Sequence, residues 1–316
     1  MRDLSAEAQQ VLVVGAGVIG SVYAGRLAEA GHLVTLVARG GRLAQLEPSG
    51  LRLRRPGGSE VRPMVTVVDQ IPRAAFDLVL VAVRREQVAA AARQVAASVP
   101  GRVMLFGNFA GMVDELGSVL GDDRTLVGFP GIGGRIEPDG LVTYVPIDQQ
   151  PTVVGTSGTQ GEQARAIVAC LREAGFDTLE QPNMAGWLAS HAALVVPMAA
   201  AIRAAGGQAD ALADQSDLLR LAVRATRAMY RNQRRRDELV VNRNLRLLYL
   251  VMPVWFATRY WSGALRGDFG ELAFAAHTRH AWDEMALLAT WLRSTIADDP
   301  AALAALDRLM AYQSGQ

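Results

Sequence analysis

The chain has 316 residues, of which 50% are hydrophobic and 20% charged, a composition typical of a globular protein long enough for two domains. Its formal net charge of +1 gives no electrostatic reason to expect nucleic acid as a partner. Its single cysteine, Cys170, excludes an internal disulfide and a multi-thiolate metal site, and its apolar helical surroundings predict a core residue.

The first predicted element is a strand that runs directly into a glycine turn and a helix. Val11–Val14 is a continuous apolar run, and a helix is expected over 21–30. The residues between them that form the fingerprint are Gly15, Gly17, Val18, Ile19 and Gly20. The glycines allow the tight turn, the approach of backbone N–H groups to a pyrophosphate, and close packing of helix on strand. The pattern predicts dinucleotide binding, with the pyrophosphate at the helix N-terminus.

The second strand, expected over 33–38, ends in a cation rather than an acid. An acid there would accept the ribose 2′-OH of NAD and repel a 2′-phosphate. This chain has Arg39, followed by Arg42, and guanidinium groups pair well with phosphate. The sequence therefore predicts NADPH. The alternative is that Arg39 only occupies a loop surface.

The rest of the first half alternates strands and helices. A short antiparallel excursion is expected from Leu51–Arg54 and Val61–Val68, around a Pro-Gly-Gly turn. The further expected strands are Asp77–Val83, Arg102–Phe106, Thr125–Phe129, Leu141–Val145 and Thr152–Gly155. The expected helices are Arg85–Ser98 and Gln160–Ala174. This alternation predicts a doubly wound parallel sheet with right-handed crossovers.

From about Asn183 the pattern changes to long apolar helices. They are expected over Met184–Ala204, Asp214–Glu238, Asn242–Ala264, Phe269–Ala297 and Pro300–Tyr312. The predicted fold class is therefore α/β. It combines an N-terminal doubly wound Rossmann domain that binds NADP (1–182) with an all-α C-terminal domain for substrate binding or dimerisation (183–316), as in 6-phosphogluconate dehydrogenase-like proteins. Ligands of such sheets bind beyond the carboxyl ends of the strands, where a helical domain would close over them.

The segment 247–261 is rich in aromatic residues and contains Pro253, which is expected to kink it. Its apolar stretch is shorter than the roughly 20 residues that a membrane span requires. A buried central helix, an apolar pocket wall and a homodimer interface are the interpretations considered, with peripheral membrane contact as a further alternative.

The chain contains no lysine, and its 32 basic residues are all arginine. No side chain can therefore form a Schiff base, and none can act as a tunable ammonium proton donor. No N-terminal signal peptide is visible, because the apolar run at Val11–Val14 leads straight into the fingerprint. The sequence thus predicts a cytoplasmic protein without a membrane partner.

Over nearly its whole length the chain resembles the ketopantoate reductase (2-dehydropantoate 2-reductase) family. The segments that carry the resemblance are Gly15–Ala24, Gly31–Arg39, Asp77–Gln87, Phe106–Gly111 and Asp283–Leu288, together with Trp187 and Pro197. The resemblance implies that Arg84 and Gln87 contact the cofactor and that Asn108 lies beside the nicotinamide and the substrate. It also implies that Glu284 helps to hold the substrate.

The segment between Trp187 and Pro197 departs from the family pattern. The family carries a catalytic Lys there, with an Asn one helical turn later, and this chain has neither. His191 lies in this helix instead, in an otherwise apolar stretch. It is either a core histidine with satisfied hydrogen bonds or the proton donor of a reductase, a role that its ordinary pKa near neutrality suits.

His277, His280 and Glu284 are spaced to share one helical face. Such a face can hold a metal, but without a fourth ligand it is more simply a polar face toward solvent or substrate, and no metal is predicted. Asn108 is the other polar residue expected in the site.

The function predicted from these features is an NADPH-dependent oxidoreductase that reduces the carbonyl of a 2-oxo acid or a bulkier ketone. Asn108 and Glu284 would position this small-molecule substrate, and His191 or a water molecule would supply the proton. One alternative is an opine-type or imine reductase that acts on C=N. The other is a non-catalytic NADPH-binding sensor, for which the missing lysine is the main argument.

Overall fold

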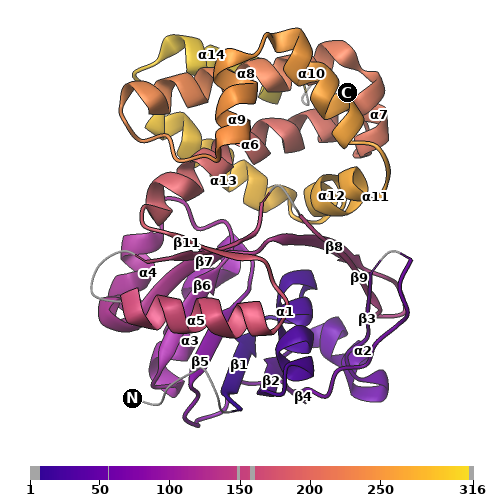
Figure 1. Ribbon diagram of the computed structural model, residues 1–316, viewed down its shortest axis with the longest axis vertical. Coiled ribbons are helices and arrows are strands. Elements are labelled where there is room, and N and C mark those ends of the chain that lie inside the picture. Colours follow the sequence, from indigo (N-terminus) through magenta and orange to yellow (C-terminus); the bar gives the residue numbers. More distant parts are fainter. Residues whose placement is uncertain (1–7, 56, 148–149, 157–160, 313–316) are drawn as a thin grey trace. The chain divides into compact units, whose positions relative to one another are not determined.

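The first half of the chain folds around an eight-stranded sheet with the order β11-β10-β7-β6-β5-β1-β2-β4 (Figure 1). Its strands are β1 (Gln10–Val14), β2 (Leu33–Val37), β4 (Thr66–Val68), β5 (Leu78–Val81), β6 (Arg102–Phe106), β7 (Thr125–Phe129), β10 (Thr152–Gly155) and β11 (Thr178–Gln181). Neighbouring strands are parallel except β7 and β10. The chain runs outward from β1 to β2 and β4, then returns to β5 on the other side of β1. The switch point of a doubly wound sheet therefore lies between β1 and β5.

The computed structural model describes residues 8–55, 57–147, 150–156 and 161–312. The chain divides into two units, 1–184 and 185–316, beside the predicted boundary at residue 182. The first is the α/β unit and the second is helical, so the predicted fold class is confirmed.

Helices cover both faces of the main sheet. The helices of this unit are α1 (Val18–Glu29), α2 (Gly40–Ser49), α3 (Arg85–Ser98), α4 (Val113–Leu120) and α5 (Gly161–Glu173), with a short 3₁₀ turn at Asp122–Arg124. Buried residues of α1 and α5 share one core with Leu78 and Leu80 of β5. Val79 and Val81 point to the opposite face, where α3 contacts β5. All four residues of β5 are buried, as expected for a strand covered on both sides.

The predicted excursion around residues 51–68 is mostly wrong. Leu53 makes a single antiparallel bridge to Val61. Leu53–Arg54 (β3) otherwise belongs to a second, three-stranded sheet with β9 (Val142–Pro146) and β8 (Ile132–Ile136), and β4 joins the main sheet parallel to β2. Pro63 explains the interruption, because proline cannot donate to a strand ladder. Pro56 of the predicted turn lies outside the described residues, as does Gln160 at the predicted start of α5.

Tyr23 ties α1 to the edge of the main sheet. Its ring stacks on Phe176 at 4.0 Å and meets Phe106 edge-on at 4.6 Å. Its hydroxyl hydrogen-bonds Thr152 Oγ1 and accepts from the Gly131 N–H at 3.3 Å. Tyr23 is fully buried, and this desolvation raises the pKa of its phenol. The network satisfies polar groups that cannot reach water.

The helical unit is built around α8. Its elements are α6 (Met184–Ala204), α7 (Ala209–Asp214), α8 (Ser216–Arg235), α9 (Arg243–Arg246), α10 (Val254–Ala264), α11 (Gly267–Gly270), α12 (Ala276–His280), α13 (Trp282–Thr295) and α14 (Pro300–Ala311), with π-helical turns η3 (Leu247–Val251) and η4 (Glu271–Ala275). Helix α8 contacts α7, α10, α14 and η3. Figure 1 shows α14 and α10 on either side of α8 in the view.

Two helices expected to be continuous are broken. The predicted helix 242–264 becomes α9, η3 and α10, and the break lies at Met252 and Pro253, because proline cannot continue the preceding turn. The predicted helix 269–297 is interrupted at Ala281, whose φ and ψ of −129° and 36° are not helical.

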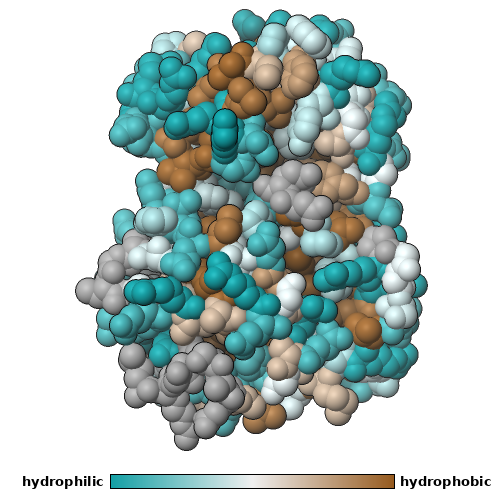
Figure 2. Space-filling model, viewed as in Figure 1, coloured by the Kyte–Doolittle hydropathy of each residue, from teal (hydrophilic) through white to brown (hydrophobic). Residues whose placement is uncertain are grey.

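The aromatic segment 247–261 is amphipathic rather than wholly buried. Tyr249, Ala257 and Trp261 lie in the core. The exposed large apolar residues of the segment are Leu247, Val251, Trp255, Phe256 and Tyr260. Figure 2 shows apolar side chains at the surface of this unit among hydrophilic ones. The interpretation as a buried central helix is therefore wrong for about half of the segment.

Among the described residues, α6 is the one helix long and apolar enough to cross a membrane by length and composition. In its most apolar window 67% of the residues are buried, and a core helix passes the same test. The helix therefore gives only weak support for a membrane span.

We predict that Tyr23→Phe lowers the free energy of unfolding by about 1–3 kcal/mol, because Thr152 Oγ1 and the Gly131 N–H lose a buried partner while the ring stack remains. Urea unfolding of the variant and the parent chain measures the difference. Tyr312→Phe, at a tyrosine that is 50% exposed, is the control and should change stability by less than about 0.5 kcal/mol. Equal stability of Tyr23→Phe and the parent chain would contradict this role.

Candidate functional site

The residues predicted to bind a cofactor lie at one edge of the main sheet. Strands β1, β2, β5 and β6 are mutually parallel, so their carboxyl ends meet at the same edge. Gly15 follows β1, Arg39 follows β2, Arg84 follows β5 and Asn108 follows β6. The sheet therefore brings together residues that are far apart in the sequence, at the edge where doubly wound sheets bind ligands.

The three glycines of the turn meet different constraints. Gly15 has a φ of +108°, and a Cβ built on it would lie 2.5 Å from the Ala82 carbonyl oxygen at the exit of β5. A Cβ on Gly20 would lie 1.8 Å from the Gly15 carbonyl oxygen. A Cβ on Gly17 would meet nothing within 4 Å. The fold itself thus requires the first and third glycines, whereas the second borders open space.

The N-terminus of α1 lies next to that open space. Gly17 is the N-cap and offers no side-chain hydrogen bond, and no acidic residue lies in the first turn. The N–H groups of Val18 and Ile19 have no acceptor within the helix, because they belong to its first turn. Together with the helix dipole they can receive an anion such as a pyrophosphate.

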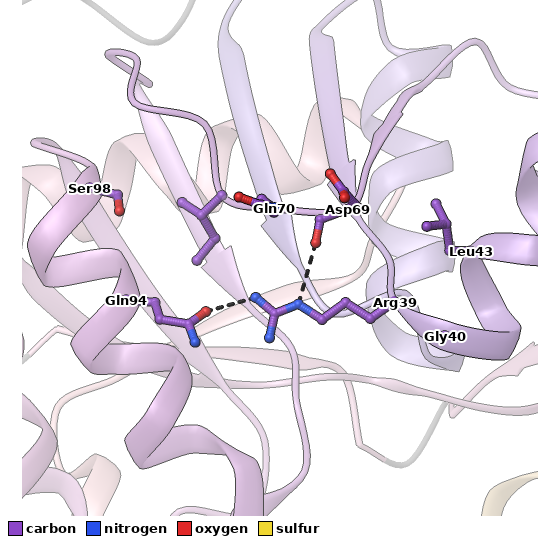
Figure 3. A pocket seen from close by; sticks show the side chains of 8 residues that line it. Arg39, Gly40, Leu43, Asp69, Gln70, Gln94 and Ser98 are labelled. Carbon is purple, nitrogen blue, oxygen red and sulfur yellow. Dashed lines mark hydrogen bonds between the residues drawn. The ribbon is translucent and has the colours of Figure 1, made fainter.

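Arg39 lines a cavity of about 640 Å³ at the carboxyl ends of β2 and β4 (Figure 3). The lining residues are Arg39, Gly40, Leu43, Asp69, Gln70, Ile71, Gln94 and Ser98. The Arg39 guanidinium donates to Gln94 Oε1 at 2.7 Å and to the Asp69 carbonyl oxygen at 3.4 Å. These bonds engage Nη2 and Nε and hold the exposed cation in a defined place. The cavity is large enough for part of a nucleotide, and Arg39 gives it a positive wall.

Arg42 has a different role from the one expected. Its guanidinium donates to the Ala16 carbonyl oxygen at 3.0 Å, the Gly140 carbonyl oxygen at 2.8 Å and Ser21 Oγ at 3.3 Å. Burial lowers the pKa of the guanidinium. Arg42 therefore holds the glycine turn in place through these hydrogen bonds, and Arg39 is the arginine that lines the cavity.

Arg84 and Gln87 form the N-terminal turn of α3. The Arg84 N–H donates to Gln87 Oε1 at 3.4 Å, and both side chains are exposed. The neighbouring Arg85 is buried, and its Nη1 donates to the Asn108 carbonyl oxygen at 2.9 Å. Arg85 thereby fixes the loop that carries Asn108. Arg85 was not among the residues expected at the site, although its helical spacing to Val88 and Ala92 places it on the buried face of α3.

In the helical unit, Glu284 lies near His277, with which the helical spacing grouped it, and its charge also affects His191. The rings of Trp187 and His191 stack at 5.1 Å and 5° on α6. His277 Nε2 lies 3.7 Å from Glu284 Oε1, across the break between α12 and α13. The Glu284 side chain is 5% exposed and that of His277 is 45% exposed. We call His191, His277 and Glu284 the histidine–glutamate cluster.

The surroundings of His191 determine its charge state. Burial lowers its pKa to about 3, the charge of His277 acts in the same direction, and Glu284 opposes both. The neutral imidazole is therefore the favoured form of His191 near neutrality.

His280 stands apart from this cluster. Its Nδ1 lies 2.8 Å from the Ala276 carbonyl oxygen on its own helix. Among the described residues, no group of three or more His, Cys, Asp or Glu side chains could hold a metal ion.

His32 and Cys170 are structural. His32 Nδ1 accepts from the Gln9 N–H at 3.2 Å, and His32 Nε2 lies 3.4 Å from Cys170 Sγ. Both residues are buried; burial lowers the pKa of His32 and raises that of Cys170 to about 12. The thiol is therefore unreactive, which confirms Cys170 as a core residue.

Residues 11–158 match the family model of ketopantoate reductase PanE/ApbA. The match covers slightly less than half of the chain and shows that this part is similar to the family. No curated protein sequence is significantly similar to the chain.

Several solved structures share the fold over almost the whole chain. One is D-mandelate dehydrogenase with NADH and anilino(oxo)acetate, at 13% identity and a TM-score of 0.77, covering 96% of this chain and 97% of that one. Another is 2-dehydropantoate 2-reductase from Geobacter metallireducens GS-15, at 13% identity and a TM-score of 0.75, covering 96% and 99%. A third is a PanE/ApbA family ketopantoate reductase from Ralstonia eutropha JMP134, at 18% identity and a TM-score of 0.71, covering 96% and 98%. At these identities the similarity establishes the fold.

We predict that acid destabilises the helical unit through His191. Its folded-state pKa of about 3 lies below the unfolded value, so the unfolded chain takes up the proton first and stability falls as the pH drops below about 6.5. Between about pH 7 and pH 5 the loss is roughly 2 kcal/mol.

Urea unfolding followed by tryptophan fluorescence at both pH values measures this loss. His191→Phe, which keeps a flat ring beside Trp187, should reduce the loss by that amount, whereas the control His280→Gln should leave it unchanged. An identical pH dependence in His191→Phe and the parent chain would show that His191 is not held neutral.

Proposed function

We propose that this chain is an NADPH-dependent reductase of a small carbonyl compound. The observation that carries the proposal is the open glycine turn at the switch point of the sheet, followed at the next strand end by a cavity with Arg39 as its cationic wall. The family matched by residues 11–158 and the structural neighbours are oxidoreductases, which supports this class of reaction.

The residues present fit a nicotinamide dinucleotide. Gly17 leaves space beside the first turn of α1, where Val18 and Ile19 can donate to the pyrophosphate. Arg84, Gln87 and Asn108 lie at the following strand ends, where the rest of the cofactor would extend. When bound, the reduced nicotinamide would supply a hydride to the carbonyl carbon.

Arg39 favours the 2′-phosphorylated form of the cofactor. A guanidinium at the end of the second strand can pair with a 2′-phosphate, whereas an acid there would accept the ribose hydroxyls of NADH. Gln94 holds Nη2 at 2.7 Å, so little side-chain freedom remains to be lost on binding. D-mandelate dehydrogenase has the same fold and is described with NADH, so the fold alone does not select the cofactor.

The proposed substrate is a 2-oxo acid or a bulkier ketone, positioned by Asn108 and Glu284. The structural similarity to D-mandelate dehydrogenase with anilino(oxo)acetate supports a 2-oxo acid with a large substituent. Glu284 is buried at 5% exposure, as expected of a carboxylate that binds a ligand rather than solvent.

A non-catalytic NADPH sensor is the second candidate. The observation in its favour is that His191, in the helix where the family keeps its catalytic lysine, is neutral. A sensor needs no substrate contacts, however, and the buried Glu284 beside His277 argues for chemistry.

We predict that Arg39→Ser raises the dissociation constant of NADPH about 10- to 100-fold, because a charged hydrogen-bonding partner of the phosphate is lost. The dissociation constant of NADH should change less than about threefold. Fluorescence titration of the reduced nicotinamide measures both constants. Gln94→Leu should weaken NADPH in the same direction but less, since it only frees the guanidinium.

Gly17→Ala is the matched comparison for these variants. Its Cβ meets nothing within 4 Å in the protein, so the variant should fold normally and yet weaken NADPH and NADH equally by intruding on the pyrophosphate. Equal affinity of the parent chain for both cofactors, or unchanged NADPH binding in Arg39→Ser, would refute NADPH selectivity.

The reaction itself is tested by NADPH oxidation with a panel of 2-oxo acids and bulky ketones, each with and without added amines. We predict turnover with a 2-oxo acid alone. Turnover only in the presence of an amine would assign a C=N reductase, and tight NADPH binding without any oxidation would assign the sensor.

A further inference from the structure

We infer that the helical unit binds the surface of a membrane that contains anionic phospholipids. The contact is made by exposed apolar side chains of η3 and α10 and by the arginines around them. Peripheral membrane contact was one of the alternatives for residues 247–261, and the structure places a row of arginines of α8 beside this segment. Membrane binding is independent of the reaction proposed above.

The apolar part of this surface lies on both sides of the turn at Met252 and Pro253. Val251 is 69% exposed before the turn, and Trp255 is 64% exposed after it. The exposed apolar side chains, which we call the η3–α10 surface, are Leu247, Val251, Trp255, Phe256 and Tyr260. A group of this kind differs from the single apolar residues that are scattered over most protein surfaces, and it marks a contact with a partner or a membrane.

Helix α10 has an outer face that is aromatic. Trp255, Phe256 and Tyr260 share this face, because Ala257 and Trp261 belong to the buried one. The ring centroids of Trp255 and Phe256 lie 5.8 Å apart. Trp and Tyr carry a polar atom on an apolar ring and are enriched where a membrane meets water. The outer face of α10 therefore has the composition of a helix that lies in the membrane interface.

The segment around this surface is strongly basic, although the chain as a whole is nearly neutral. Residues 218–267 contain 11 arginines and two acidic residues, and no acidic residue occurs in 239–267. Among the residues that the structure describes, Arg243, Arg246 and Arg259 are exposed and form no ion pair. The η3–α10 surface is therefore flanked in the chain by cations that are available to an anionic partner.

Helix α8 brings further arginines to the same place, since it contacts both η3 and α10 (Figure 1). Four arginines of α8 are spaced to share one helical face, namely Arg224, Arg227, Arg231 and Arg234. Arg227 Nη2 donates to the Met252 carbonyl oxygen at the turn between η3 and α10. Burial lowers the pKa of Arg227, and the nearby charge of Arg231 acts in the same direction. Arg227 thus joins the arginine row of α8 to the η3–α10 surface.

An anionic membrane fits this surface better than a second copy of the chain does. In an isologous dimer the same patch meets itself, which would bring the arginines of the two copies together. Such like-charge contacts oppose association. A membrane offers phosphate groups to the guanidinium groups and an apolar phase to the side chains of η3 and α10.

Nucleic acid offers the same phosphates but no apolar phase. Bases can stack on Trp255 or Tyr260, because every base has a flat face. Leu247 and Val251 are aliphatic and provide no such face, yet they are 43% and 69% exposed beside the aromatic residues. Aliphatic and aromatic side chains that are exposed together favour lipid.

The first test is sedimentation of the full chain with vesicles of phosphatidylcholine, either alone or with about one-third phosphatidylglycerol. We expect binding to the anionic vesicles at least about tenfold tighter than to the neutral ones. Binding should weaken at about 0.5 M salt, because salt screens the exposed charges. Equal binding to both kinds of vesicle, or no binding to either, would overturn the inference.

Substitutions at exposed positions locate the contact. Trp255→Ser should weaken binding to the anionic vesicles about fivefold or more, and Arg243→Gln combined with Arg246→Gln about tenfold or more. The matched controls are Leu287→Ser, at an apolar residue of α13 that is 46% exposed, and Arg165→Gln, at an exposed arginine of the α/β unit. Both controls should bind as the parent chain does. Equal binding by the parent chain and Trp255→Ser would contradict a contact through α10.

Tryptophan fluorescence tests the same contact directly. Trp255 is the one exposed tryptophan among the residues that the structure describes. Phospholipids with brominated acyl chains should quench the fluorescence of the parent chain. Trp255→Phe keeps an apolar ring, so it should still bind the vesicles but lose most of the quenching. Unchanged quenching in Trp255→Phe would place the contact elsewhere and overturn the inference.

The other occupants of this surface give different results. A chain that binds no vesicles, sediments as a dimer and becomes monomeric in Trp255→Ser would assign the surface to a second copy. Binding of a single-stranded oligonucleotide in place of vesicles would assign it to nucleic acid. Either result would overturn the inference. NADPH binding by Trp255→Ser should equal that of the parent chain, so neither result bears on the proposed function.

Discussion

The candidate cofactor site depends on the close approach of two strand ends at the switch point of the sheet. A Cβ on Gly15 would lie 2.5 Å from the Ala82 carbonyl oxygen, and one on Gly20 would lie 1.8 Å from the Gly15 carbonyl oxygen. The turn can therefore pass beside β5 only without side chains at these positions. As a result, the first turn of α1 borders the open space beside Gly17. Arg42 holds the glycine turn in place by donating to the Ala16 carbonyl oxygen. The candidate anion site is thus formed mainly by backbone.

Much of this unit could be predicted because its constraints are local. The glycine spacing, the buried strand β5 and the arginine after β2 are all visible within short segments. The sequence did not predict strand β8, because Gly133 and Gly134 interrupt the alternation of polar and apolar residues. A side chain at position 134 would be too close to the neighbouring strand, since a Cβ on Gly134 would lie 2.5 Å from the Thr143 carbonyl oxygen. Helix α2 was missed because it begins with two glycines and contains Pro48.

Two features of the helical unit, a helix break and a charge state, could not be predicted from the sequence. The periodicity that grouped His277 with Glu284 assumed one continuous helix, yet the two side chains meet across a break at Ala281. The grouping of His191 with Glu284 came from a resemblance, and the structure brings the two close enough for Glu284 to affect the pKa of His191. The charge state of His191 could not be predicted, because it depends on how completely the surrounding helices exclude water.

The chain has no lysine, and helix α6 carries His191 in an otherwise apolar stretch. A lysine would have brought its own charge into the apolar helix α6, whereas His191 there is neutral and requires no counter-charge. Glu284 of the same unit is buried, and a buried carboxylate is stabilised by hydrogen bonds and by nearby opposite charge. His277 Nε2 lies 3.7 Å from Glu284 Oε1, and the His277 side chain is 45% exposed. The histidine–glutamate cluster thus places polar side chains of α6, α12 and α13 in a largely apolar unit without any lysine.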